Sequence, residues 1–213
     1  MSQQRSSKTN LAIGSSGWLH QQWEENYYPD DIPDEWRLNF YSHHFQCVLM
    51  RPDEWLTATS EKLAQWCEDI DESFAFFVSV TDQLDDVAIT HLQQLKAQLG
   101  NQLKGLIFQS KAVTLNRSYL NDLSAILTLY ADSDELIESE TTIQVCWRAQ
   151  REIKQASVGF IDKATSENIR EVRAHLEIFL EQSTDSDLYL FFEGDPPDSS
   201  RMQETKVIHQ LLS

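Results

Sequence analysis

Basic residues, glycine, proline and cysteine are all scarce in this chain of 213 residues. It holds 17 Lys and Arg against 34 Asp and Glu, so its formal charge is −17. Nucleic-acid binding needs clustered Lys and Arg to neutralise phosphates, so this charge argues against a nucleic-acid partner. It argues against acidic membrane surfaces for the same reason. We interpret the acidic excess as a source of solubility.

Sequence motifs for metals, disulfides and membrane spans are also missing. Cys47, Cys67 and Cys146 lie far apart, and the chain has no C-x-x-C, H-x-H or H-E-x-x-H pattern. We therefore predict no metal site and no cofactor. No run approaches the roughly 18 apolar residues of a membrane span, and residues 1–10 lack the apolar segment of a signal peptide. These absences favour a cytoplasmic protein with reduced thiols.

What the chain does contain is enough apolar material for one packed core. Hydrophobic residues make up 41% of the sequence and aromatic residues 10%. This length and composition predict a single domain over residues 11–213, preceded by a disordered tail over residues 1–10.

Apolar strand patterns alternate with amphipathic helix patterns along that domain. Helices are expected over 34–44, 87–99, 117–130, 166–182 and 202–212. A further helix is expected to begin at a capping residue, Ser60. Seven strands are expected over 11–14, 46–50, 74–80, 105–109, 142–147, 158–162 and 188–193. This alternation indicates right-handed βαβ units and a parallel sheet, and fits an open doubly wound sheet as well as a closed barrel.

The start of the chain carries the most distinctive motif. The first strand runs into Gly14-Ser15-Ser16-Gly17-Trp18, and Trp23 and Tyr27-Tyr28-Pro29 follow. This stretch resembles the opening of the YecE-like family, also called domain of unknown function seventy-two, which reads I-G-[ST]-S-G-W-x-Y-x-x-W and then F-Y-P. Weaker similarities follow in the same order at 36–45, 74–78, 99–109 and 188–195.

The resemblance implies an α/β, TIM-barrel-like parallel barrel. Only about ten residues separate Trp147 from Val158, where the family usually has a further strand and helix. We therefore expect a shortened and divergent member, with an incomplete barrel of about seven strands.

Several polar positions of the family pattern are changed in this chain. Leu49 stands in place of its Glu, Arg51 in place of its Asn, and Ser79 in place of its Lys. The resemblance thus implies that the polar mouth of the barrel has been largely lost, as in a pseudoenzyme.

Candidate site residues are those that follow the strands, because parallel barrels place their reactive groups at the carboxyl ends of strands. For ligand binding these are Ser15, Ser16, Trp18, His20, Trp23 and Gln109. Asp162, Glu193 and Arg148 are weaker candidates for catalysis, because two carboxyl groups across a mouth suit glycosidase-like chemistry.

Three functions remain open at this point. The first is a non-catalytic protein that binds a small molecule or a protein partner at or near the mouth. The second is a small hydrolase-like enzyme that uses the replacement carboxylates. The third is a homodimeric interaction protein, because a missing strand would leave an exposed sheet edge.

Overall fold

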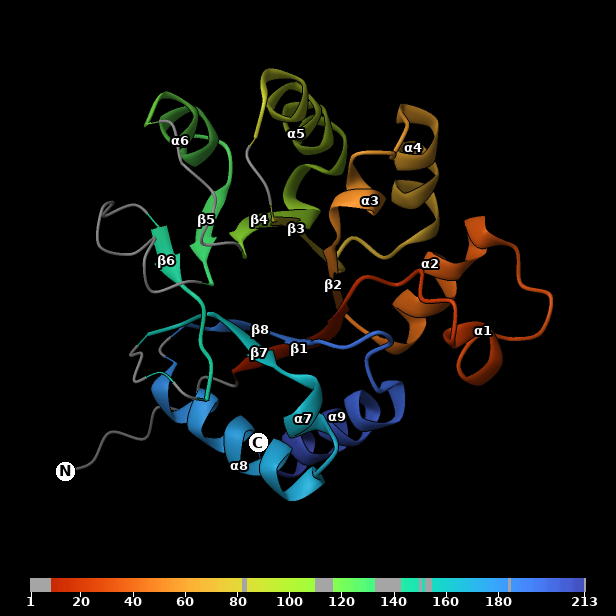
Figure 1. The fold of residues 1–213 in the computed structure, drawn as a ribbon, viewed down its shortest axis with the longest axis vertical. Helices are drawn as coiled ribbons and strands as arrows, with labels where there is room; N and C mark the ends of the chain where they lie inside the picture. The colour runs from red at the N-terminus through yellow and green to blue at the C-terminus, as the bar shows by residue number, and fades with distance from the viewer. Residues whose placement is uncertain are drawn as a thin grey trace.

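Eight parallel strands form one sheet in the part of the chain that the structure describes. The computed structural model describes residues 9–81, 84–109, 117–132, 143–149, 151, 155–183 and 185–212. The sheet order is β6-β5-β4-β3-β2-β1-β8-β7, and Figure 1 shows the strands as a central ring with the helices around it. The strands are β1 (Asn10–Ser16), β2 (Cys47–Met50), β3 (Ala75–Val80), β4 (Leu103–Phe108), β5 (Thr128–Ala131), β6 (Ile143–Val145), β7 (Val158–Ile161) and β8 (Asp187–Phe192).

The ring closes where the two outermost strands of this order meet. Trp147, just beyond β6, forms a parallel bridge with Gly159 of β7. The Trp147 N–H donates to the Val158 carbonyl at 2.8 Å, and the Trp147 carbonyl accepts from the Phe160 N–H at 3.1 Å. The predicted TIM-barrel-like fold is therefore confirmed, with a short seam between β6 and β7.

The strand count is eight, where the sequence analysis expected about seven. The missed strand is β5, because residues 117–130 read as one continuous helix. In the structure α6 (Arg117–Ser124) ends early, and β5 begins four residues later at Thr128. Leu129, Tyr130 and Ala131 are all buried. A short strand that is buried on both faces has no alternating pattern to separate it from a buried helix.

The remaining helices lie close to their expected positions, with boundaries set by capping residues. Thr59, not Ser60, caps α4, because its hydroxyl accepts from the Lys62 N–H. Asp85 and Asn168 cap α5 and α8 in the same way. The helices are α1 (Trp23–Asn26), α2 (Asp34–His44), α3 (Pro52–Trp55), α4 (Ser60–Asp69), α5 (Asp86–Leu99), α7 (Lys163–Ser166), α8 (Ile169–Gln182) and α9 (Ser199–Leu212), with the 3₁₀ helix η1 at Gly100–Gln102.

The expected N-terminal tail overlaps the first strand by one residue. Residues 1–8 of the predicted tail lie outside the described residues, and Asn10 already belongs to β1. None of the helices in the described ranges combines the length and apolar character needed to cross a bilayer.

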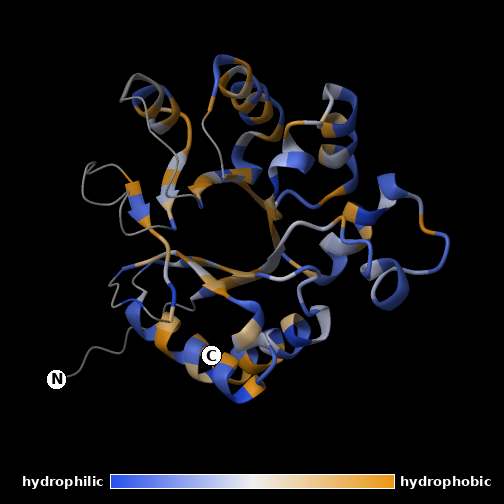
Figure 2. Cartoon of the chain, viewed as in Figure 1, coloured by the Kyte–Doolittle hydropathy of each residue, from blue (hydrophilic) through white to orange (hydrophobic). Residues whose placement is uncertain are grey.

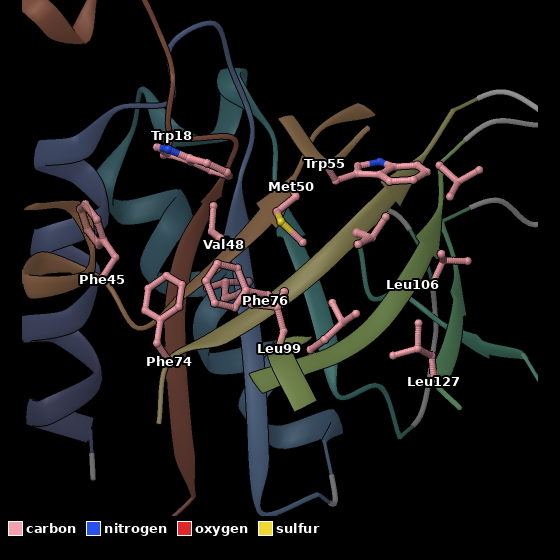
Figure 3. Packing of buried hydrophobic residues seen from close by; sticks show 14 of the residues in the cluster. Trp18, Phe45, Val48, Met50, Trp55, Phe74, Phe76, Leu99, Leu106 and Leu127 are labelled. Atoms are coloured by element: carbon pink, nitrogen blue, oxygen red, sulfur yellow. The ribbon is translucent and has the colours of Figure 1, made fainter. Parts of the chain in front are cut away.

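The strands bury both faces, which separates the core into an inner and an outer layer. The outer layer packs the strands against the helices, and Figure 3 shows part of it, including Trp18, Val48 and Phe76. Hydrophobic colouring in Figure 2 is accordingly strongest on the strands, while the helices mix both colours. The inner layer fills the barrel with Ala12, Cys47, Leu49, Ala75, Phe77, Ile107, Tyr130, Cys146, Val158, Phe160 and Phe191.

Aromatic rings pack against one another inside the barrel. The ring centroids of Phe77 and Phe191 are 5.3 Å apart, and those of Phe160 and Phe191 are 5.8 Å apart. A barrel of this size is a packed core rather than a pore, so ligand-binding groups must lie at its ends.

Gly14 is the position where two strands approach most closely. Gly14 pairs with Cys47 across β1 and β2, and a Cβ atom added to it would lie 1.9 Å from the Cys47 carbonyl oxygen. Backbone atoms of a central strand cannot move aside as a flexible side chain can, so this position requires glycine.

We predict that Gly14→Ala destabilises the barrel by at least about 3 kcal/mol, because the added methyl group overlaps backbone atoms. The matched control is Ser16→Ala in the same strand, with an expected change within about 1 kcal/mol. Urea unfolding followed by circular dichroism measures both values. Equal midpoints for the two variants would contradict the tight β1–β2 contact.

Candidate functional site

The carboxyl ends of the strands form one end of the barrel, which we call the mouth. Because side chains alternate along a strand, residues two positions beyond an inward-facing residue also point inward. Gln109 follows Ile107 in this way, Asp132 follows Tyr130, Arg148 follows Cys146 and Glu193 follows Phe191. The mouth thus gathers polar side chains from strands that are far apart in the sequence.

Arg148 is the centre of a group of four charged residues that we call the mouth ion cluster: Asp132, Arg148, Arg151 and Glu193. The Arg148 guanidinium donates to Asp132 through Nε, at 2.7 Å, and through a second nitrogen. It also donates to both carboxylate oxygens of Glu193, each at 2.8 Å. Arg151 donates to Asp132 Oδ1 at 3.0 Å. Two carboxylates therefore share one guanidinium in bidentate geometry.

The cluster is partly shielded from water. The Asp132 side chain is 5% exposed and the Arg148 side chain 19%, and the Arg148 guanidinium carbon lies 4.7 Å from the centre of the Phe160 ring. Burial opposes the charge of Arg148, but the hydrogen bonds and charges of Asp132 and Glu193 outweigh it and raise the pKa of Arg148. Two positive and two negative groups leave the cluster with no net charge.

The described contacts place the three catalytic candidates in two separate groups. Arg148 and Glu193 meet in the ion cluster, whereas Asp162 caps α7, with its Oδ1 accepting from the Thr165 N–H at 2.8 Å. A general acid or nucleophile needs a carboxyl oxygen that can reach the substrate. Here Glu193 is held by Arg148, and one carboxyl oxygen of Asp162 is held by the backbone of a helix.

His20 connects two loops at the mouth. Its ring is buried, with Nδ1 3.1 Å from the Asp195 carboxylate and Nε2 2.9 Å from the Ser16 carbonyl. Burial lowers the pKa of His20, whereas the two flanking acceptors favour a ring that donates from both nitrogens. The Trp23 indole N–H donates to the Pro197 carbonyl at 3.0 Å and joins the same two loops.

Of the other ligand-binding candidates, Ser15, Trp18 and Trp23 are buried against the helices. The Ser15 hydroxyl donates to the Gly17 carbonyl at 2.6 Å and lies 2.9 Å from the Tyr41 hydroxyl. Trp18 packs edge-on against Trp66, with ring centroids 5.3 Å apart. Among the six candidates, only Ser16 and Gln109 combine a place at the mouth with a partly exposed side chain.

The sequence analysis did not anticipate the role of Glu54. Its carboxylate is buried in α3, where Oε1 accepts from the N–H groups of Trp18 and Leu19 at 3.0 and 3.3 Å, and Oε2 accepts from the Arg51 N–H at 2.8 Å. The sequence signal was Pro52 at the first helical position together with Glu54 at the third, the position that carries the Glu of a capping box. Glu54 fixes the loop after β1 to the loop after β2.

Asp132 was missed because the strand before it, β5, was not predicted, and Arg151 was missed because it lies several residues beyond its strand. The described residues contain no group of three or more His, Cys, Asp or Glu side chains that could hold a metal ion. Cys47 and Cys146 are free thiols inside the barrel, and Cys67 is a free and exposed thiol.

Comparison with known proteins places this architecture in a family. The model of the family described as "Protein of unknown function DUF72" matches residues 12–138. This chain belongs to the DUF72 family. The YecE-like resemblance predicted from the sequence is therefore confirmed, since both names denote one family. No curated protein matches the DUF72 chain described here.

Solved structures of DUF72 proteins show the same fold. A DUF72 family protein from Thermotoga maritima is 14% identical, with a TM-score of 0.64 over 94% of this chain and 99% of its own. One from Enterococcus faecalis is 10% identical, with a TM-score of 0.56 over 96% and 97% of the two chains. At these identities the comparison supports the barrel fold and leaves activity to be argued from the site.

We predict that Arg148→Met destabilises the protein by about 3 kcal/mol, because Glu193 loses its ion-pair partner and the buried Asp132 loses its bidentate one. The matched control is Arg173→Met on α8, where the exposed pair with Glu177 contributes within about 0.5 kcal/mol. Urea unfolding of the two variants compares them directly. If both variants lose equal stability, the ion cluster does not hold the mouth together.

A second prediction concerns the pH dependence of stability. Burial raises the pKa of Glu54 despite its hydrogen bonds, so the native state binds this proton more tightly than the unfolded chain. Between the ordinary Glu value of about 4.3 and the raised pKa, the contribution of Glu54 to the free energy of unfolding falls as pH rises. Glu54→Gln removes that titration.

The measurement is urea unfolding of the natural protein and of Glu54→Gln at a series of pH values. The free energy of unfolding of the natural protein minus that of the variant should decrease as pH rises through this window. A difference that stays constant, or that increases, would show that Glu54 does not carry a raised pKa.

Proposed function

We propose that this DUF72 protein is a non-catalytic barrel that binds an uncharged, hydrogen-bonding small molecule at its mouth. The observation that supports the proposal is the saturation of Arg148 by both Asp132 and Glu193. The charged side chains closest to the barrel interior thus neutralise one another.

The charge balance of the mouth determines the class of ligand. An ionic ligand loses hydration on entering a partly buried site, and this loss must be offset by an opposite charge. The Arg148 guanidinium already serves two carboxylates, and Arg151 serves Asp132. Hydroxyl or amide groups of a neutral molecule, by contrast, can bond to Ser16 and Gln109 without disrupting the cluster.

The same contacts argue against the hydrolase alternative. Glycosidases need one carboxyl group that can be protonated and a second that can attack or activate water. In this mouth Glu193 and Asp132 bind the same guanidinium, and Glu54 accepts three backbone N–H groups. These acids have structural partners in place of a substrate.

The test is thermal unfolding in the presence of neutral sugars and polyols, with acetate and ammonium salts as charged probes. We expect saturable stabilisation by one or more neutral compounds, because a ligand that binds the native state raises its melting temperature. Gln109→Leu should abolish the saturable part, whereas Gln93→Leu on the exposed surface of α5 should retain it.

Two results would contradict the proposal. One is saturable stabilisation by the charged probes alone. The other is enzymatic release of nitrophenol from nitrophenyl glycosides or esters that is lost in a Glu193→Gln variant. The Gln93→Leu control separates specific binding from the general stabilising effect of sugars, which depends on the whole surface.

A further inference from the structure

A second hollow lies at the opposite end of the barrel, where β4 and β5 begin. It has a volume of about 810 Å³, is open to solvent, and lies between the end of α5 and the connection from α6 to β5. We call it the basal hollow. It is lined by Lys96, Asn101, Leu103, Lys104, Ser124, Ala125, Ile126, Leu127, Thr128 and Leu129.

The charge of the basal hollow differs from that of the rest of the molecule. Among the described residues, the two ionisable side chains that line it are lysines and none is acidic, although the chain carries a formal charge of −17. Within the described part of the chain, neither ammonium group has a carboxylate within ion-pair distance. Lys96 Nζ instead donates to the carbonyls of Gly100 and Leu103 at 2.8 and 3.1 Å.

The two ammonium groups are close enough to influence each other. Burial, and next the charge of Lys104, lower the pKa of Lys96. Lys96 is held in place by two carbonyls and still has one N–H to donate. An anion between the two lysines would compensate both charges.

The remaining lining residues determine what kind of anion fits. Asn101, Ser124 and Thr128 supply neutral hydrogen-bonding groups, while Ala125 and Ile126 supply apolar surface. The volume lies in the range of pockets for organic ligands, roughly 300–1,000 Å³. An inorganic ion would leave most of this space and the apolar surface unused.

We propose that the basal hollow binds a small organic anion, with its phosphate or carboxylate group at Lys96 and Lys104 and its apolar part against Ala125 and Ile126. This site is separate from the mouth and does not depend on the function proposed there. The two lysines of the hollow repel cations and attract anionic ligands, even though the protein as a whole is acidic.

The experiment is a titration of the ¹⁵N-labelled full chain, followed by amide NMR shifts, with phenyl phosphate, benzoate and neutral benzyl alcohol as probes. We expect saturable shifts at 101–104 and 124–129 with phenyl phosphate, benzoate or both, and the stronger of the two identifies the preferred acidic group. Lys104→Glu should weaken this binding at least about tenfold, as expected for loss of a charge-assisted hydrogen bond.

The matched control is Lys62→Glu on the exposed face of α4, which changes the total charge equally and should leave binding unchanged. Lys96→Gln is a second variant, in case Lys104→Glu perturbs β4, and unchanged amide positions elsewhere establish that each variant is folded. Equal binding of benzyl alcohol, equal weakening by Lys62→Glu, or no saturable shift at the hollow would overturn the proposal.

Discussion

The mouth of this barrel depends on one guanidinium that two carboxylates share. Arg148 joins Asp132, which follows β5, to Glu193, which follows β8, and lies over Phe160 of β7. The backbone seam between β6 and β7 is short, with a single bridge at Trp147. The ion cluster adds side-chain bonds across the same region, so it connects strands that the backbone seam joins only weakly. Removing one partner of such a cluster costs more than the cluster itself contributes, because the remaining charges stay buried.

Buried polar groups hold the other half of the mouth in the same way. Glu54 accepts three backbone N–H groups and joins the loops after β1 and β2, while His20 joins the loops after β1 and β8. Glu54 satisfies backbone N–H groups at the mouth, and the buried ring of His20 finds partners for both of its own nitrogens. In both cases the oxygen and nitrogen atoms of the side chain bond to other parts of the protein and join neighbouring loops of the mouth.

The parts of the fold that could be predicted from the sequence are those with a local signal. The Gly14–Trp18 motif, the strand preceding it and the amphipathic helix at 34–44 all depend on neighbouring residues and were found. The strand β5 was missed because Leu123, Leu127 and Tyr130 also fit a helical repeat, and only tertiary packing decides between the two. The partners of Arg148 could not be predicted either, since Asp132 and Glu193 are 16 and 45 residues away in sequence. Arg148 and Glu193 were proposed from their positions after strands, which is a topological signal, but their mutual neutralisation is a matter of side-chain geometry.

Charged side chains are therefore arranged differently at the two ends of the barrel. At the mouth, the opposite charges of the ion cluster lie within hydrogen-bond distance and cancel one another. At the base, two lysines remain without carboxylate partners among the described residues, in a chain whose overall charge repels anions at long range. Salt screens this long-range repulsion over about 8–10 Å, but it weakens a direct contact between an anion and a lysine less, because that contact is shorter than the screening length. Moderate ionic strength thus reduces the barrier to anion approach more than it weakens the local attraction, and a local positive site can function on an acidic protein.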